Sequence, residues 1–196
     1  MRDRNRFFRN ALVGSLLLLL AGIGTIAQAQ DQERMTIQAT AMGTSTQMGK
    51  MVDVNIHIEK FSTQDDRKVL IDAFNRSGQD GLVDALDHMK EMGRFGTPYG
   101  VGNAVKYIIE LPPDKGRRHI RLVTDRRLAF GELYASTRSR EYSVGAIDLF
   151  LTPDGKGSEG KALPACKLKV NKKTQQIDVE TYQFPWNLTN LRITKE

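Results

Sequence analysis

The stretch VDVNIHIE at residues 52–59 decides the fold class, because apolar and polar residues alternate in it without a break. A strict period of two places all of its apolar side chains on one face of a strand and its polar side chains on the other. The apolar face consists of β-branched residues, namely Val52, Val54, Ile56 and Ile58. A strand with one apolar and one polar face is typical of an antiparallel sheet, so we expect antiparallel structure here.

The period changes to a helical one after this strand. Ser62 or Thr63 can cap the start of a first helix, and Gly78 can end it in a left-handed conformation. Asp80 is the expected start of a second helix, which Gly93 ends. The buried stripes of the two helices would be Val69, Leu70, Ala73 and Phe74, then Leu82, Val83, Leu86 and Met89. We expect these stripes to pack on the apolar face of residues 52–58.

Alternation returns in the second half of the chain. It predicts strands at 105–111, 119–124, 129–135 and 143–151, followed by a closing hairpin of 166–170 with 177–181. Pairing Val170 with Ile177 in that hairpin would set Lys169 opposite Asp178. Such cross-strand charge pairs contribute roughly 0.2–1 kcal/mol each, which supports this register. The same phase predicts that Cys166, the single cysteine, is buried and inert.

The order of these elements favours an α+β domain over residues 35–196. We predict a predominantly antiparallel, curved sheet of about seven strands, with a pair of short helices inserted after the second strand. A closed β-barrel is the alternative. Because strands and helices do not alternate along the chain, a parallel nucleotide-binding sheet is not expected.

Residues 1–29 have the composition of a cleavable signal peptide. Four arginines and one aspartate in the first ten residues precede a charge-free apolar run over 11–26. The run ends at Ala27-Gln28-Ala29, a cleavage pattern, and is shorter than the roughly 20 apolar residues of a membrane-spanning helix. We therefore expect cleavage after Ala29, a loose leader over 30–34, and export to the periplasm or the extracellular space.

The charge of the chain comes partly from this leader. Loss of residues 1–29 lowers the formal net charge from +6 to +3. A charge this small argues against a nucleic-acid partner. Basic stretches at 115–121, 126–127 and 138–140 could still meet on one side of the sheet and attract lipid headgroups or an anionic envelope polymer.

Two motifs carry possible chemistry. The segment GKGSEGK at 155–161 has the glycine and lysine spacing of a phosphate-binding loop. Ala162 stands where that loop needs a hydroxyl, and a strand follows instead of a helix, so we interpret the segment as a plain hairpin loop. His57 and Glu59 share the polar strand face and could supply two metal ligands if another strand brought a third, although a solvated outer face explains them with no further assumption.

We expect a non-enzymatic binding or structural domain of the cell envelope, with no cofactor. A metal-assisted or hydrolytic enzyme that uses His57 and Glu59 is the alternative. If the helices do not fill the curve of the sheet, an apolar pocket for a hydrophobic small molecule or lipid remains between them. Its expected lining is Phe74, Leu86, Met89, Tyr99, Phe184 and Trp186.

Overall fold

Antiparallel strands make up most of the structure, a computed structural model that describes residues 34–128, 142–171, 174–181 and 184–195. These residues lie within one of the two units into which the chain divides, Asp31–Glu196. The described elements in chain order are β1 (Met35–Met42), the 3-10 helix η1 (Ser45–Gln47), β2 (Met51–Ile58), α1 (Gln64–His88), β3 (Gly93–Gly96), β4 (Asn103–Asp114), β5 (Arg117–Thr124), β6 (Val144–Leu151), β7 (Glu159–Asn171), β8 (Gln176–Thr181) and β9 (Trp186–Lys195).

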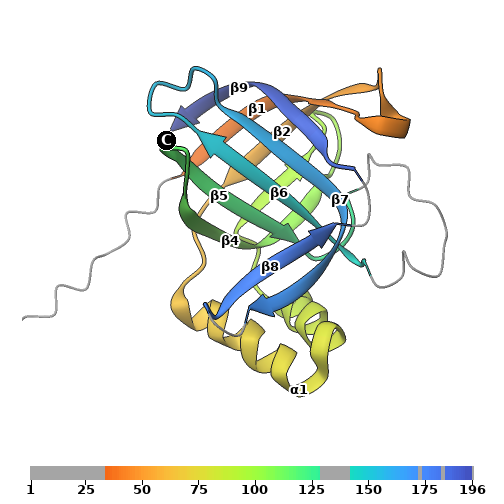
Figure 1. The fold of residues 1–196 in the computed structure, drawn as a ribbon, viewed down its shortest axis with the longest axis vertical. Helices are drawn as coiled ribbons and strands as arrows, with labels where there is room; N and C mark the ends of the chain where they lie inside the picture. The colour runs from red at the N-terminus through yellow and green to blue at the C-terminus, as the bar shows by residue number, and fades with distance from the viewer. Residues whose placement is uncertain (1–33, 129–141, 172–173, 182–183, 196) are drawn as a thin grey trace, which may run out of the picture. The chain divides into compact units, whose positions relative to one another are not determined.

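The sheet closes on itself. Its strand order is β6-β5-β4-β3-β2-β1-β9-β7-β8, and β6 also pairs with β7. Eight of the described strands therefore form a closed antiparallel barrel, while β8 pairs with the far half of β7 outside the ring (Figure 1). The closed barrel was the alternative expectation, and the open curved sheet of about seven strands is not confirmed.

The interior of the barrel is a packed apolar core. Alternation along each strand sends every second side chain inward, as expected for a small barrel whose side chains fill it. From β2 the core receives Val54, Ile56 and Ile58, at most 2% exposed. The prediction that the helices cover this strand face is wrong, because closure of the sheet turns the face into the barrel.

Helix α1 packs instead on the outer surface of the barrel, beside β8 and the far half of β7 (Figure 1). Leu70, Leu82 and Leu86 are fully buried there, whereas Val69, predicted to be part of the buried stripe, is 52% exposed on the solvent side of the helix. They share a second apolar cluster with side chains that point outward from the sheet, among them Tyr107, Cys166, Leu168 and Ile177. The Gln79 side-chain oxygen accepts a hydrogen bond from the Leu168 amide at 3.1 Å, which ties the helix to β7.

The start and the middle of α1 follow the sequence signals, but its end does not, because α1 ends at His88 and the predicted stop, Gly93, begins β3. Thr63 caps the helix, with reciprocal hydrogen bonds between Thr63 and Asp66 that form a capping box. The two predicted helices are one element, but its backbone leaves helical geometry at Ser77 and at Gly78, where φ is +63°. A left-handed φ favours glycine, so the predicted boundary between two helices is present as a break within α1.

The closing hairpin has the predicted register. Val170 pairs with Ile177, and Lys169 lies opposite Asp178. The ion pair of Lys169, however, is made with Glu180, the diagonal neighbour. Cys166 is fully buried as predicted, and burial raises the pKa of its thiol well above the ordinary value. The predicted strand at 129–135 lies outside the described residues.

No helix in the part of the chain that the structure describes has both the length and the apolar character of a membrane span.

Candidate binding site at the barrel mouth

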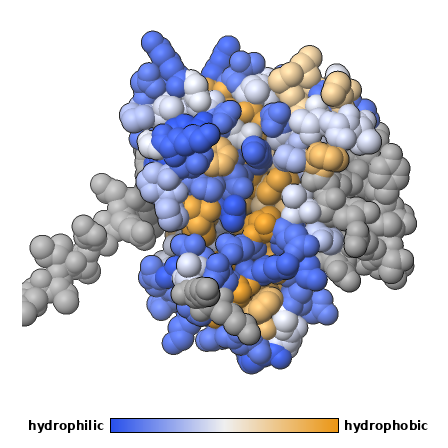
Figure 2. All heavy atoms as spheres, viewed as in Figure 1, coloured by the Kyte–Doolittle hydropathy of each residue, from blue (hydrophilic) through white to orange (hydrophobic). Residues whose placement is uncertain are grey.

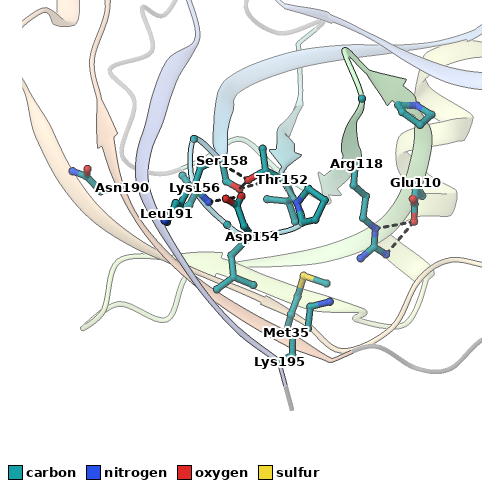
Figure 3. A pocket seen from close by; sticks show the side chains of 17 residues that line it. Met35, Glu110, Arg118, Thr152, Asp154, Lys156, Ser158, Asn190, Leu191 and Lys195 are labelled. Atoms are coloured by element: carbon teal, nitrogen blue, oxygen red, sulfur yellow. Dashed lines mark hydrogen bonds and ion pairs between the residues drawn. The ribbon is translucent and has the colours of Figure 1, made fainter.

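One end of the barrel opens into a hollow of about 1030 Å³. Four parts of the chain surround it, namely the start of β1, the β4–β5 hairpin, the loop between β6 and β7, and the end of β9 (Figure 3). This volume lies at the upper end of the range for small-molecule sites, roughly 300–1,000 Å³. The hollow therefore has room for a ligand of ordinary metabolite or lipid-fragment size.

The inner wall of the hollow is apolar. Met35, Leu151, Leu191 and Ile193 contribute side chains to it. Below this level the barrel is filled, since Ile37, Ile58 and Leu149 are at most 2% exposed. A ligand in the hollow would therefore rest on the packed core and would not enter a continuous channel.

A charged pair stands on the inward face of the wall. Arg118 occupies the same strand phase as Ile120, which points into the core, and it binds the Glu110 carboxylate at 3.0 Å. The Arg118 guanidinium also lies over the Phe61 ring, 5.3 Å from the ring centre, which is within the roughly 6 Å of a cation–π contact. Figure 3 shows Arg118 and Glu110 facing each other at the edge of the hollow. The pair places a fixed charge where the barrel meets water.

The β6–β7 loop forms a braced wall. The Ser158 hydroxyl accepts from the Thr152 amide at 3.0 Å, and the Thr152 hydroxyl donates to the Lys156 carbonyl at 2.8 Å. The Lys156 amide in turn donates to the Asp154 carboxylate at 3.1 Å. The segment that resembles a phosphate-binding loop is a hairpin loop, as predicted. These hydrogen bonds brace the wall, and bracing of this kind lowers the entropy cost of binding a ligand.

The lining carries charges of both signs. Its cations are Arg118, Lys156 and Lys195, and its anions are Glu110 and Asp154. The excess of one positive charge lies beside the apolar wall and the polar groups of Thr152, Ser158 and Asn190. Such a combination suits an amphipathic molecule with an anionic or strongly polar head.

The structure does not gather the six predicted pocket residues into one site. Phe74, Leu86 and Met89 lie in or against the cluster between α1 and the barrel. Tyr99 and Phe184 are exposed on the surface, whereas Trp186 is buried in the barrel core. None of the six lines the hollow at the mouth.

His57 and Glu59 lie on the outer face of the barrel, and both line a small hollow of about 280 Å³ there. The His57 ring is hydrogen-bonded to the Thr36 hydroxyl at 3.1 Å. Among the described residues, no three histidine, cysteine, aspartate or glutamate side chains come together as a metal site. The described residues around His57 and Glu59 therefore provide no third ligand of these types for the metal site that the sequence suggested.

An ionic cluster on the outer face was not foreseen. The Arg121 guanidinium donates to both carboxylate oxygens of Asp148, at 2.7 and 3.0 Å, and the His119 ring lies 3.2 Å from the same carboxylate. Arg117 is likewise bound to Glu159 and Asp114. These cations of the 115–121 stretch are therefore neutralised within the barrel wall. The stretch at 138–140 lies outside the described residues.

The mouth itself was also missed. Glu110 and Arg118 continue the inward phase of Ile108 and Ile120 with charge. Alternation in the sequence instead assigns Tyr107 and Ile109 to the apolar face and Glu110 to the polar one. Glu110 turns inward because the pairing of β4 with β5 shifts register between Val105 and Tyr107. Comparison with family models, curated proteins and solved structures finds no significant match. The case for function therefore rests on the geometry of the mouth.

Proposed function

We propose that this chain is an exported, non-enzymatic binding protein that holds one small amphipathic molecule in the mouth of its barrel. The observation that carries the proposal is the hollow of about 1030 Å³ with an apolar inner wall and a charged rim. Apolar walls with a few placed polar groups are the usual composition of small-molecule sites.

The apolar part of the ligand would lie against Met35, Leu151 and Leu191. Removing a hydrocarbon chain from water contributes about 0.8 kcal/mol for each buried CH₂ group, so a chain of several carbons is enough for binding. The filled core below the hollow limits how deep the chain can reach. We therefore expect a ligand of moderate length with its head at the rim.

The head of the ligand would meet Arg118, because its guanidinium is fixed on two sides by Glu110 and Phe61. A planar guanidinium suits a carboxylate or a phosphate oxygen. Since Glu110 already balances one cation, the head group has to share Arg118 or bind the nearby Lys195 or Lys156. A single negative charge matches the excess of one positive charge in the lining.

The expected export of the chain fits this use. A molecule with a hydrocarbon part is poorly soluble in the aqueous space outside the inner membrane, and an apolar wall would shield that part from water. The predicted signal peptide at 1–29 is the support for this location.

The test is calorimetric titration of the purified protein with dodecanoate and with dodecanol, which differ only in the head. We expect saturable binding of one dodecanoate per chain. Leu191→Trp, which places a large ring in the hollow, should abolish binding, whereas Val69→Trp on the exposed face of α1 should leave it unchanged. Absence of saturable binding of both ligands, or binding that Leu191→Trp does not alter, refutes the proposal.

The role of the charged rim has its own test. Arg118→Met should weaken dodecanoate about tenfold, the equivalent of roughly 1.4 kcal/mol, and should leave dodecanol nearly unchanged. Arg76→Met is the matched control, because Arg76 is exposed on α1, where its guanidinium donates to the Asp72 backbone carbonyl. Equal weakening of both ligands by Arg118→Met would contradict the role of the head group and would indicate a general loss of fit.

A further inference from the structure

Three methionines are exposed on one hairpin. The chain has seven methionines, and of those that the structure describes, Met35 and Met92 are buried and Met89 is half-buried. The exposed ones are Met42 at 40%, Met48 at 80% and Met51 at 65%, all in the hairpin of β1 and β2. Methionine is normally among the more buried residues, so packing does not account for these three.

Two of the three face each other directly. Met42 and Met51 are register partners across β1 and β2, on the outer face of the sheet. The next pair toward the turn is hydrogen-bonded, with the Gly43 amide donating to the Lys50 carbonyl at 2.9 Å. Hydrogen-bonded and non-hydrogen-bonded pairs alternate in an antiparallel ladder, so Met42 and Met51 form a non-hydrogen-bonded pair, whose side chains lie closest.

The third methionine is at the tip of the same hairpin. Met48 follows the 3-10 turn η1, and its amide donates to the Ser45 carbonyl at 3.1 Å. Met51 is three positions after Met48, so their Cα atoms are at most roughly 10–11 Å apart. The methionine side chain is long and unbranched, so the thioether of Met48 can reach the pair from this position.

The hairpin is held in place at its tip. The Thr44 hydroxyl donates to the Pro185 carbonyl at 2.6 Å, which ties the turn to the segment before β9. The Thr189 hydroxyl on β9 contacts the Met42 sulfur at 3.5 Å. Figure 2 shows pale apolar side chains at the upper right, where Figure 1 places the tip of this hairpin. The methionines are therefore presented to solvent on an anchored element.

We propose that the sulfurs of Met42, Met48 and Met51 bind one soft monovalent cation, Cu(I), for which Ag(I) is the redox-stable substitute. Thioethers are soft, neutral ligands that select Cu(I) over Zn²⁺, Mg²⁺ and Ca²⁺. Three neutral donors leave a single positive charge at an exposed site, where water can solvate it. The buried Cys166 cannot compete for the ion, since it lies under α1.

Thioether ligation has a pH signature. Thiol and imidazole ligands must lose a proton to bind a metal, so their affinity falls as the pH is lowered. A thioether has no such proton. Binding at this hairpin should therefore be constant between about pH 5 and pH 8, the range in which a histidine site would lose its ion.

The experiment labels the methionine methyl groups of the full protein with ¹³C and follows them by NMR during titration with Ag(I). We expect saturation at one ion per chain, with shifts of the Met42, Met48 and Met51 methyl signals and no shift of the Met35 and Met92 signals. Met42→Leu, Met48→Leu and Met51→Leu keep the apolar surface but remove the sulfur. Each should lower the affinity at least about tenfold, the loss that even an outer-shell partner of a metal site causes.

Met89→Leu is the matched control, because it removes a sulfur away from the hairpin and should leave the affinity unchanged. Binding of Cu(I) under anaerobic conditions, measured by competition with a chromogenic chelator, should follow the same order of variants. No saturation with Ag(I), unaltered affinity in all three leucine variants, or affinity that falls at low pH would overturn the proposal and would indicate an apolar contact surface in place of a metal site.

Discussion

The ionic cluster on the outer face predicts a large loss of stability when its acceptor is removed. Asp148 accepts two hydrogen bonds from Arg121, at 2.7 and 3.0 Å, and lies 3.2 Å from the His119 ring. The side chains of these three residues are only 11–15% exposed. Asp148→Ala would leave the Arg121 cation nearly buried without a partner.

Breaking a buried ion pair on one side costs roughly 3–5 kcal/mol, because the remaining charge keeps its desolvation cost without its partner. For a chain of this size, that corresponds to a fall in melting temperature on the order of 6–20 °C. Urea unfolding followed by circular dichroism measures the free energy directly. The control is Asp72→Ala on the exposed face of α1, which should change the stability by no more than about 0.5 kcal/mol.

A double variant separates the cost of an orphaned charge from the value of the pair. Asp148→Leu combined with Arg121→Met replaces the pair by apolar side chains and should recover most of the lost stability. A loss below about 1 kcal/mol for Asp148→Ala, or a double variant no more stable than Asp148→Ala, would refute the reasoning. Because Asp148 does not line the mouth, ligand binding at the mouth should persist in any variant that remains folded.

The remaining predictions concern the helix and the residues beneath it. Cys166 should not react with thiol reagents in the native protein, because it is fully buried and burial raises the pKa of its thiol; fast labelling without unfolding would contradict this. Burial also raises the pKa of Tyr107 to about 12, and both groups are held protonated in the native state. Their contribution to stability should therefore be complete below the ordinary thiol pKa and should decline at higher pH, by up to about 1.4 kcal/mol per pH unit for each group. Urea unfolding at pH 7 and pH 10 measures this decline in the free energy of unfolding. A smaller decline in Cys166→Ala would give the part that comes from the thiol. A free energy of unfolding that rises between pH 7 and pH 10 would contradict the prediction. Gly78→Ala should destabilise the protein by about 1 kcal/mol, because φ is +63° there and a Cβ atom disfavours that conformation. Gly49→Ala is the control, because it introduces the same kind of backbone strain at a positive φ outside α1. A gain in stability for Gly78→Ala would mean that α1 runs through this position without a break.

How far the sequence predicts the fold depends on whether the signal is local. The capping box of Thr63 and Asp66, the break at Gly78 and the register of Val170 with Ile177 follow from neighbouring residues, and all are present. Closure of the barrel depends on the pairing of β6 with β7 and of β1 with β9. The alternation of apolar and polar residues indicates which face of a strand is apolar, but it does not indicate whether that face packs against a helix or lies inside a barrel. The position of α1 was mispredicted for this reason.

The candidate site was harder to predict for the same reason. The mouth combines residues from the start, middle and end of the domain, such as Met35, Arg118 and Lys195. No short motif joins them, because they come together only when the ring closes. The predicted site residues Phe74, Leu86 and Met89 were identified correctly as an apolar group, yet they serve the contact between α1 and the barrel.

Several local departures from regular strand geometry lie at the mouth. Of the described residues with positive φ, four line the hollow, namely Gly116, Gly155, Gly157 and Asn190. At Asn190, the pairing of β1 with β9 shifts register between Gln38 and Thr40, as a β-bulge does. Bulges and left-handed residues are retained in barrels where a strand must bend or aim a side chain. Natural chains break local rules mainly at functional or strained sites, so these departures support the mouth, in preference to the packed interface under α1, as the proposed ligand site.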